Sequence, residues 1–155
     1  VGYGSSADAH DMIQPIEGGA GSARSIKWAM QRGKIDPTEI DLINPHGTST
    51  PVGDEREALA FHSAFGARAA EIPVSATKSL TGHSQGAAGV HEAIYTLLMM
   101  QNNFICESAN IQTLDPAVEG ANIVRKRIDN AKIATAMSNS FGFGGTNAAL
   151  IVSKI

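Results

Sequence analysis

Short apolar runs of strand length alternate with longer stretches of helical periodicity in the amino-terminal part of the chain, and this alternation limits the folds open to it. Helical spacing of apolar side chains extends over residues 18–32, 54–65 and 84–100, and short apolar runs occupy 40–44 and 72–75. Alternating strands and helices build a sheet that is covered by helices on its faces. The sequence therefore predicts an α/β fold.

The carboxyl-terminal part has a different pattern, in which two strand candidates flank a glycine-rich turn. The candidates cover residues 132–140 and 147–153, and residues 141–146 lie between them. This arrangement predicts a β-hairpin, which adds an antiparallel end to the sheet. The helix over 84–100 is apolar nearly all round, which is typical of a helix buried inside a layered protein.

The charge balance and the single cysteine exclude several classes of function. The 12 basic and 15 acidic side chains give a net charge of −3, which provides no positive field for nucleic acid or a membrane surface. Cys106 is the only cysteine, which excludes an internal disulfide framework and fits a reducing compartment such as the cytoplasm. The 43% apolar composition is enough to form one buried core and a single domain.

Three polar segments follow predicted strands, where α/β proteins usually build their sites. They are residues 44–51, 75–84 and 141–146. The first two carry His46, Lys78 and His83, and the glycines of the third expose backbone N–H groups that could bind an anion. Taken singly, each has an ordinary structural explanation as a hydrogen-bonding histidine, a solvated lysine or a hairpin turn. Together they are far more specific.

The combined motifs closely resemble one enzyme family. The strings NPHGTSTPVGD from Asn44, VSATKSLTGHSQGAAG from Val74 and SNSFGFGGTN from Ser138 are similar to the β-ketoacyl-[acyl-carrier-protein] synthases of fatty-acid synthesis. They look most like the bacterial type I elongation enzyme, and the resemblance extends over essentially the whole chain. It implies a thiolase-type fold made of two similar halves, of which residues 1–155 would be the carboxyl-terminal half.

The resemblance also implies an architecture and a reaction. The expected half is a mixed five-stranded sheet with helices on both faces and a carboxyl-terminal hairpin, and residues 1–17 would be a remnant strand and connector of the first half. The family joins an acyl-enzyme thioester to malonyl carrier protein with loss of carbon dioxide. Expected partners are acyl carrier protein, acyl and malonyl thioesters, and a second subunit of a homodimer. No metal and no cofactor are expected beyond the carrier's phosphopantetheine arm.

The catalytic roles are carried over residue by residue. His46 and His83 match the two histidines that face the thioester carbonyl, where a developing enolate needs fixed hydrogen-bond donors. Lys78 matches the family's lysine, and Glu57, which aligns with a family glutamate, is its expected partner.

Other positions match residues that hold the substrate. Thr48 and Thr50 resemble the threonines that bind the phosphopantetheine arm. Phe143 matches the residue whose backbone N–H contributes to the oxyanion hole and whose ring gates the acyl pocket, with Phe141 in support. Asp54 is expected to have only a structural or water-binding part.

Cys106 is not expected to be the nucleophile, because it lies in an apolar context far from any helix start. The family's catalytic cysteine belongs to the first half, so the isolated chain is expected to be inactive. Two alternatives remain: a non-catalytic partner resembling the chain-length factors and, with weaker support, a thiolase. A nucleotide-binding module is disfavoured because the glycine turn joins two strands.

Overall fold

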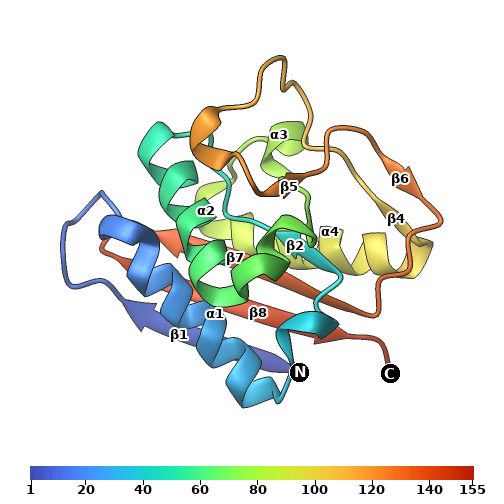
Figure 1. The fold of residues 1–155 in the computed structure, drawn as a ribbon, viewed down its shortest axis with the longest axis horizontal. Coiled ribbons are helices and arrows are strands. Elements are labelled where there is room, and N and C mark those ends of the chain that lie inside the picture. The colour runs from blue at the N-terminus through green and yellow to red at the C-terminus, as the bar shows by residue number, and fades with distance from the viewer.

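The computed structural model describes residues 1–155, and its framework is one mixed sheet of six strands in the order β1-β8-β7-β2-β3-β5 (Figure 1). The strands are β1 (Gly2–Ala7), β2 (Leu42–Asn44), β3 (Pro73–Val74), β5 (Asn122–Ile123), β7 (Thr135–Gly142) and β8 (Thr146–Ser153), with β4 (Phe104–Ile105) and β6 (Ile128–Asp129) forming a separate two-stranded ribbon. The α-helices are α1 (Ala20–Gly33), α2 (Pro51–Phe65), α3 (Lys78–Thr81) and α4 (Ala88–Asn102). Five short 3-10 helices cover Glu17–Gly19, Pro37–Glu39, Gly66–Ala70, Gln85–Ala87 and Pro116–Val118.

The sheet contains six strands, not the expected five, because the opening segment joins it. All six residues of β1 pair with β8 in antiparallel register, from Gly2 opposite Ile151 to Ala7 opposite Thr146. The expected hairpin is present as β7 and β8, which are also antiparallel. Strand β2 runs parallel to both β3 and β7, so these three strands end at the same edge of the sheet.

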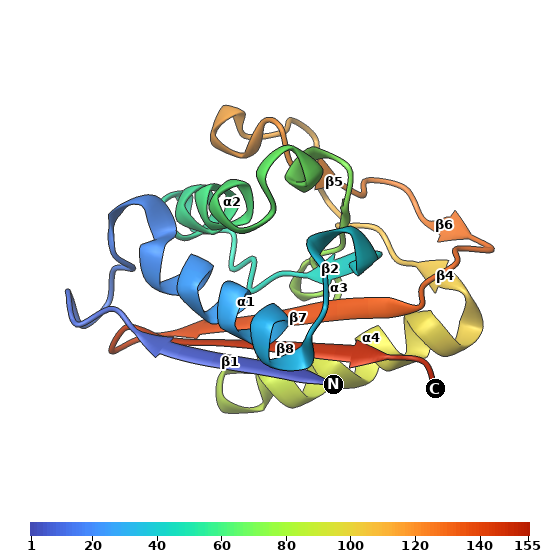
Figure 2. The same ribbon diagram turned by 60° about the horizontal axis from the view of Figure 1, so that its bottom comes forward.

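Helices cover both faces of the sheet, as the resemblance implies. Figure 2 shows α1 and α2 on one side of the long hairpin and α4 on the other. Glycines in β1 allow α1 to lie very close to the strand. A Cβ atom at Gly4 would come closer than 3.0 Å to the carbonyl oxygen of Ser25, and one at Gly2 would do the same at Ala29. Strand β1 is therefore a packing surface for α1.

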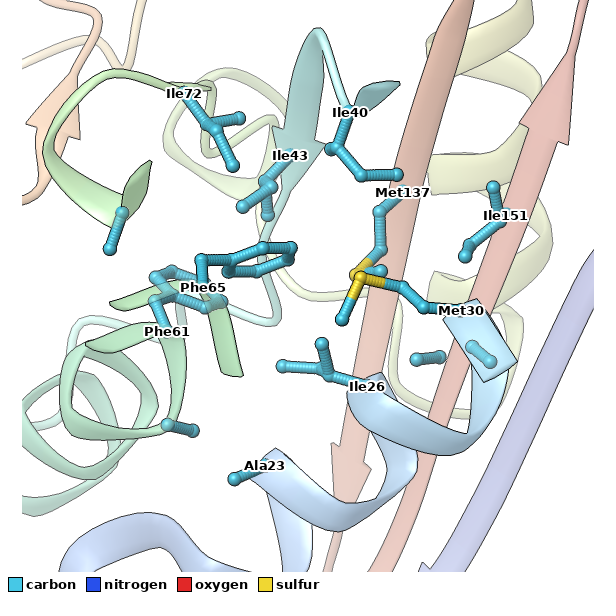
Figure 3. Close-up of a cluster of buried hydrophobic side chains, with 14 of the residues drawn as sticks. Ala23, Ile26, Met30, Ile40, Ile43, Phe61, Phe65, Ile72, Met137 and Ile151 are labelled. Atoms are coloured by element: carbon cyan, nitrogen blue, oxygen red, sulfur yellow. The ribbon is translucent and has the colours of Figure 1, made fainter. Parts of the chain in front are cut away.

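The core is divided by the sheet into two clusters. The larger one lies beneath α1 and α2 and contains Ile26 and Met30 from α1 and Phe61 and Phe65 from α2 (Figure 3). The smaller one lies between the sheet and α4 and includes Met99, Met100 and Ile105. Strand β7 contributes to both clusters, because successive side chains of a strand point to opposite faces.

One face of α4 is not covered, in contrast to the expectation of a helix buried all round. Val90 is 64% exposed, Ile94 48%, Leu97 42% and Leu98 44%, and these side chains recur at helical spacing along the outer face. The inner face packs on the sheet through Thr96, Met99 and Met100. The difference arises because no other element of the chain lies over the outer face. None of the helices combines the length and apolar character that crossing a membrane needs.

Candidate active site

The shared edge of β2, β3 and β7 gathers the three polar segments singled out in the sequence. His46 follows β2, Lys78 and His83 follow β3, and Phe141 lies near the end of β7. The parallel pairing of β2 with its two neighbours is the reason that segments so distant in sequence meet. Residues from all three exits therefore share one region of the surface.

The two histidines lie side by side at this edge. Their ring centroids are 5.5 Å apart and the rings are nearly perpendicular, at 86°. The Phe141 ring lies 6.0 Å from that of His46, on a tilted plane. His46 is partly buried, whereas His83 is exposed.

The surroundings determine the charge state of the His46 ring and the tautomer of the neutral His83 ring. Burial lowers the pKa of His46 from 6.5 to about 3, with further lowering by the positive charge of Lys78 and by His83. His46 is therefore a neutral imidazole near neutral pH, and its Nδ1 is buried without a hydrogen-bond partner. In His83 the Nδ1 atom accepts the backbone N–H of Gln85 at 3.0 Å, so a neutral His83 carries its proton on Nε2.

Lys78 lies buried behind the histidine pair, with 9% of its surface exposed. Its ammonium group donates to the backbone oxygen of His46 at 2.5 Å and forms an ion pair with Glu92 of α4. The expectation that Glu57 would be its partner is wrong. Glu92 is 2% exposed, and burial raises the pKa of its carboxyl group while the adjacent Lys78 opposes that rise.

Glu57 instead holds the backbone of the His46 loop. Its two carboxylate oxygens accept the N–H groups of His46 and Gly47, each at 2.8 Å. Burial raises the pKa of this carboxyl group from 4.5 to about 7, against the lowering effect of the two backbone hydrogen bonds. Asp54, one turn earlier on α2, accepts the N–H of Ser49 at 3.1 Å. Helix α2 thus fixes the loop through two carboxylates.

A cavity of about 520 Å³ opens beside these groups. Thr48 and Thr50 lie on its wall with their hydroxyl oxygens 3.1 Å apart, and Lys78 and His83 line it as well. The opposite wall is the irregular segment 108–115. A space of this size, lined by both polar and apolar residues, is large enough for a small-molecule ligand.

Phe143 and Cys106 lie apart from this cluster. Phe143 is 79% exposed in the turn between β7 and β8, where Gly144 and Gly145 have positive φ angles. The Cys106 sulfur lies 3.1 Å from the Ser75 hydroxyl and 3.5 Å from the Met99 sulfur. These contacts place Cys106 on the inner side of α4, packed against Ser75 and Met99.

Three polar residues at the site were not singled out from the sequence. Asn44 is fully buried, donates to the backbone oxygen of Glu92 at 3.3 Å, and accepts from Thr77 at 3.1 Å. Asn139 is also fully buried, and neither polar atom of its amide has a hydrogen-bond partner. The third is Glu92. Its sequence signal is a lone carboxylate in an apolar helical run, because a buried carboxylate is costly without a partner.

Comparison with known proteins defines the class to which this fold and site belong. Residues 1–112 match the family described as "Beta-ketoacyl synthase, C-terminal domain", and the chain belongs to that family.

Individual relatives extend the likeness to the whole chain. The 3-oxoacyl-[acyl-carrier-protein] synthase 1 of Haemophilus influenzae is 57% identical over 99% of the chain, and that of Escherichia coli K12 is 52% identical over 100%. The chain spans 36% of the length of each of these relatives. Among solved structures, a β-ketoacyl synthase from Burkholderia phymatum has a TM-score of 0.92 at 36% identity, covering 100% of this chain and 37% of that one. A ketosynthase solved in complex with its acyl-carrier protein, from a type II polyketide synthase, has a TM-score of 0.94 at 29% identity, covering 99% of this chain and 38% of that one.

Proposed function

We propose that this chain is the carboxyl-terminal part of a 3-oxoacyl-[acyl-carrier-protein] synthase that elongates fatty acids by decarboxylative Claisen condensation. The observation that carries the proposal is the pair of imidazoles 5.5 Å apart, with the buried Lys78–Glu92 ion pair behind them. The 57% identity to a synthase of this type supports the same assignment.

The chemistry requires hydrogen-bond donors at one carbonyl oxygen. Malonyl thioester loses carbon dioxide, and the electron pair of the broken C–C bond moves into the thioester as an enolate. Imidazole N–H groups from His46 and His83 would stabilise the enolate oxygen. The enolate carbon then attacks the acyl thioester, a C–C bond forms, the C–S bond breaks, and the enzyme thiolate leaves.

Lys78 has a positioning role in this proposal. Its ammonium group contacts the backbone of His46, and its charge adds to burial, the larger cause, in lowering the pKa of that ring. His46 therefore stays neutral, and a neutral ring has one N–H to donate. Thr48 and Thr50 would hydrogen-bond the phosphopantetheine arm within the cavity, and the turn that contains Phe143 would supply the backbone N–H of an oxyanion hole.

The nucleophile is proposed to come from other residues of the complete synthase. Cys106 contacts Ser75 and Met99 and not the histidine pair, so we expect no condensation by the 155 residues alone. The uncovered face of α4 would pack against the other half of the enzyme, and residues 1–17 would form the link to it. Acyl carrier protein as partner, a homodimer as assembly and the cytoplasm as location belong to the same proposal.

The alternative of a non-catalytic chain-length factor is disfavoured by the complete set of His46, Lys78 and His83, because a cavity-shaping subunit needs none of them. The residue at the nucleophile position of the complete protein would decide between the two. A cysteine there supports a synthase, and a glutamine supports the partner subunit.

The experiment is malonyl decarboxylation by the complete enzyme with single histidine substitutions. We expect His46→Ala and His83→Ala each to lower the rate by roughly two to three orders of magnitude, the usual effect of removing one oxyanion donor. His62→Ala is the matched control, because His62 is exposed on α2 and should leave the rate unchanged. A near-normal rate in either site variant would remove that histidine from the proposed mechanism.

A further inference from the structure

The exit of β3 is joined to the irregular segment after β4 by a row of side-chain hydrogen bonds. The Ser75 hydroxyl donates to the backbone oxygen of Cys106 at 2.7 Å. The Ser108 hydroxyl oxygen accepts the N–H of Ala76 at 2.9 Å. The row then reaches Ser79, on the first turn of α3 next to Lys78.

Ser79 connects α3 to two successive residues of the irregular segment. Its hydroxyl donates to the backbone oxygen of Ala76 and accepts the N–H of Ala109, both at 2.7 Å. The side-chain amide of Asn110 donates to the Ser79 backbone oxygen at 3.2 Å. A hydroxyl can donate one hydrogen bond and accept another at once, which an alanine side chain cannot do.

The tethered segment is one wall of the cavity beside the histidines. Residues 108–111 and Ser79 itself line this cavity, and Thr48 and Thr50 line it from the α2 side. Residues 106–115 contain no helix or strand, so no regular backbone ladder holds them in place. The position of this wall therefore depends on hydrogen bonds such as those made by Ser79.

We propose that Ser79 is a positioning residue that sets the separation between the two walls of the cavity, and through it the binding of the carrier-borne substrate arm. The inference rests on the proposed function, which places that arm at Thr48 and Thr50. Ser79 touches neither the histidine rings nor, in this account, the reacting atoms. Its hydroxyl binds the backbone N–H of Ala109 and in this way fixes the position of the wall.

The test compares variants of the complete enzyme in condensation assays with malonyl carrier protein. Ser79→Ala should raise KM about tenfold, because a displaced wall would lose contacts with the arm that are worth roughly one hydrogen bond. It should change kcat by less than about twofold. Ser79→Thr keeps the hydroxyl and should restore KM. Thr81→Ala is the matched control on the same helix, because the Thr81 hydroxyl contacts only the local backbone oxygens of Thr77 and Gly82.

Two further measurements separate arm binding from general damage. Amide exchange at Ala109 should accelerate in Ser79→Ala and not in Thr81→Ala, with the two variants retaining similar melting temperatures. Inhibition by carrier protein that lacks its arm should be the same for all variants. An unchanged KM alongside faster exchange at Ala109 would overturn the inference, and so would an equal fall in kcat and kcat/KM. A complete wild-type enzyme without condensing activity would instead reject the proposed function.

Discussion

The buried ion pair between Lys78 and Glu92 links α3 to α4 directly behind the histidine pair. Both side chains are almost fully buried, so each depends on the other for the compensation of its charge. Lys78 also donates to the backbone of His46, which connects the pair to the proposed catalytic loop. The pair is thus part of the support for the site as well as part of its electrostatics.

Removal of one partner should destabilise the chain more than removal of both. Lys78→Met leaves the Glu92 carboxylate buried without compensation, which typically costs about 3–5 kcal/mol of unfolding free energy. The double variant Lys78→Met with Glu92→Leu should recover most of that loss. Urea denaturation of the two variants measures the difference, and equal losses in both would contradict the pairing.

The pH dependence of stability should contain two opposed contributions at the His46 loop. The pKa of His46 is lowered from 6.5 to about 3, so the unfolded chain binds more protons between these values and the unfolding free energy rises with pH. The pKa of Glu57 is raised from 4.5 to about 7, so the folded chain binds more protons and the unfolding free energy falls as pH rises across that window.

Glu57→Gln should leave the His46 contribution to the pH dependence of stability without the opposing contribution of Glu57. Between pH 4.5 and 6.5 the slope of unfolding free energy against pH should become more positive by up to about 1.4 kcal/mol per pH unit. Glu55→Gln, at an exposed position on the same helix, should leave the slope unchanged. Denaturation curves collected across this range make the comparison. The same slope in wild type and Glu57→Gln would place the carboxyl pKa near its ordinary value.

At the residue scale, sequence patterns identified the site segments but not the contacts within them. The motifs predicted that His46, Lys78 and His83 would belong together, and the parallel strands bring them to one edge. The predicted partner of Lys78, Glu57, is wrong because two buried acids are candidates, Glu57 on α2 and Glu92 on α4, and these helices cover opposite faces of the sheet (Figure 2). Only the packing of α4 on the sheet determines which carboxylate reaches the ammonium group.

At the scale of elements, β1 and α1 pack against each other at very short range. Gly2 and Gly4 bring the strand against the helix so closely that a methyl group at either position would meet backbone atoms. Such atoms cannot rotate away as a flexible side chain can, so the helix itself would have to move.

Gly4→Ala should therefore lower stability by about 1–3 kcal/mol, the usual range for overpacking a core. Gly86→Ala is the control, because a Cβ atom there would meet nothing within 4 Å and the residue has no positive φ angle. Thermal unfolding of the two variants checks the difference. Equal melting temperatures would show that α1 is free to shift away from β1.

The strand count of the sheet is an architectural feature that local patterns could not supply. The alternating runs predicted β2, β3 and the β7–β8 hairpin, since each has its own apolar signal. Strand β1 is predicted as a strand, which the resemblance assigns to the first half of the fold, but its pairing with β8, almost the whole chain away in sequence, is not predicted. Pairing over such a distance leaves no trace in local periodicity.

At the scale of the whole molecule, the outer face of α4 is an uncovered apolar stripe formed by Val90, Ile94, Leu97 and Leu98. An apolar surface of this kind tends to associate when it is left in water. The isolated chain should therefore self-associate at micromolar concentrations, and Ile94→Lys with Leu97→Gln should reduce that association. Sedimentation velocity measures the change. In the complete enzyme the same substitutions should impair folding, and normal assembly would contradict the proposed burial of the stripe.

The convergence of three strand exits at one edge has a consequence for the lifetime of the site. His46, His83 and Phe141 come from segments that lie close together only while β2 stays paired with β3 and β7. Loss of pairing between these strands would separate the rings, so the geometry of the imidazole pair depends on an intact sheet edge.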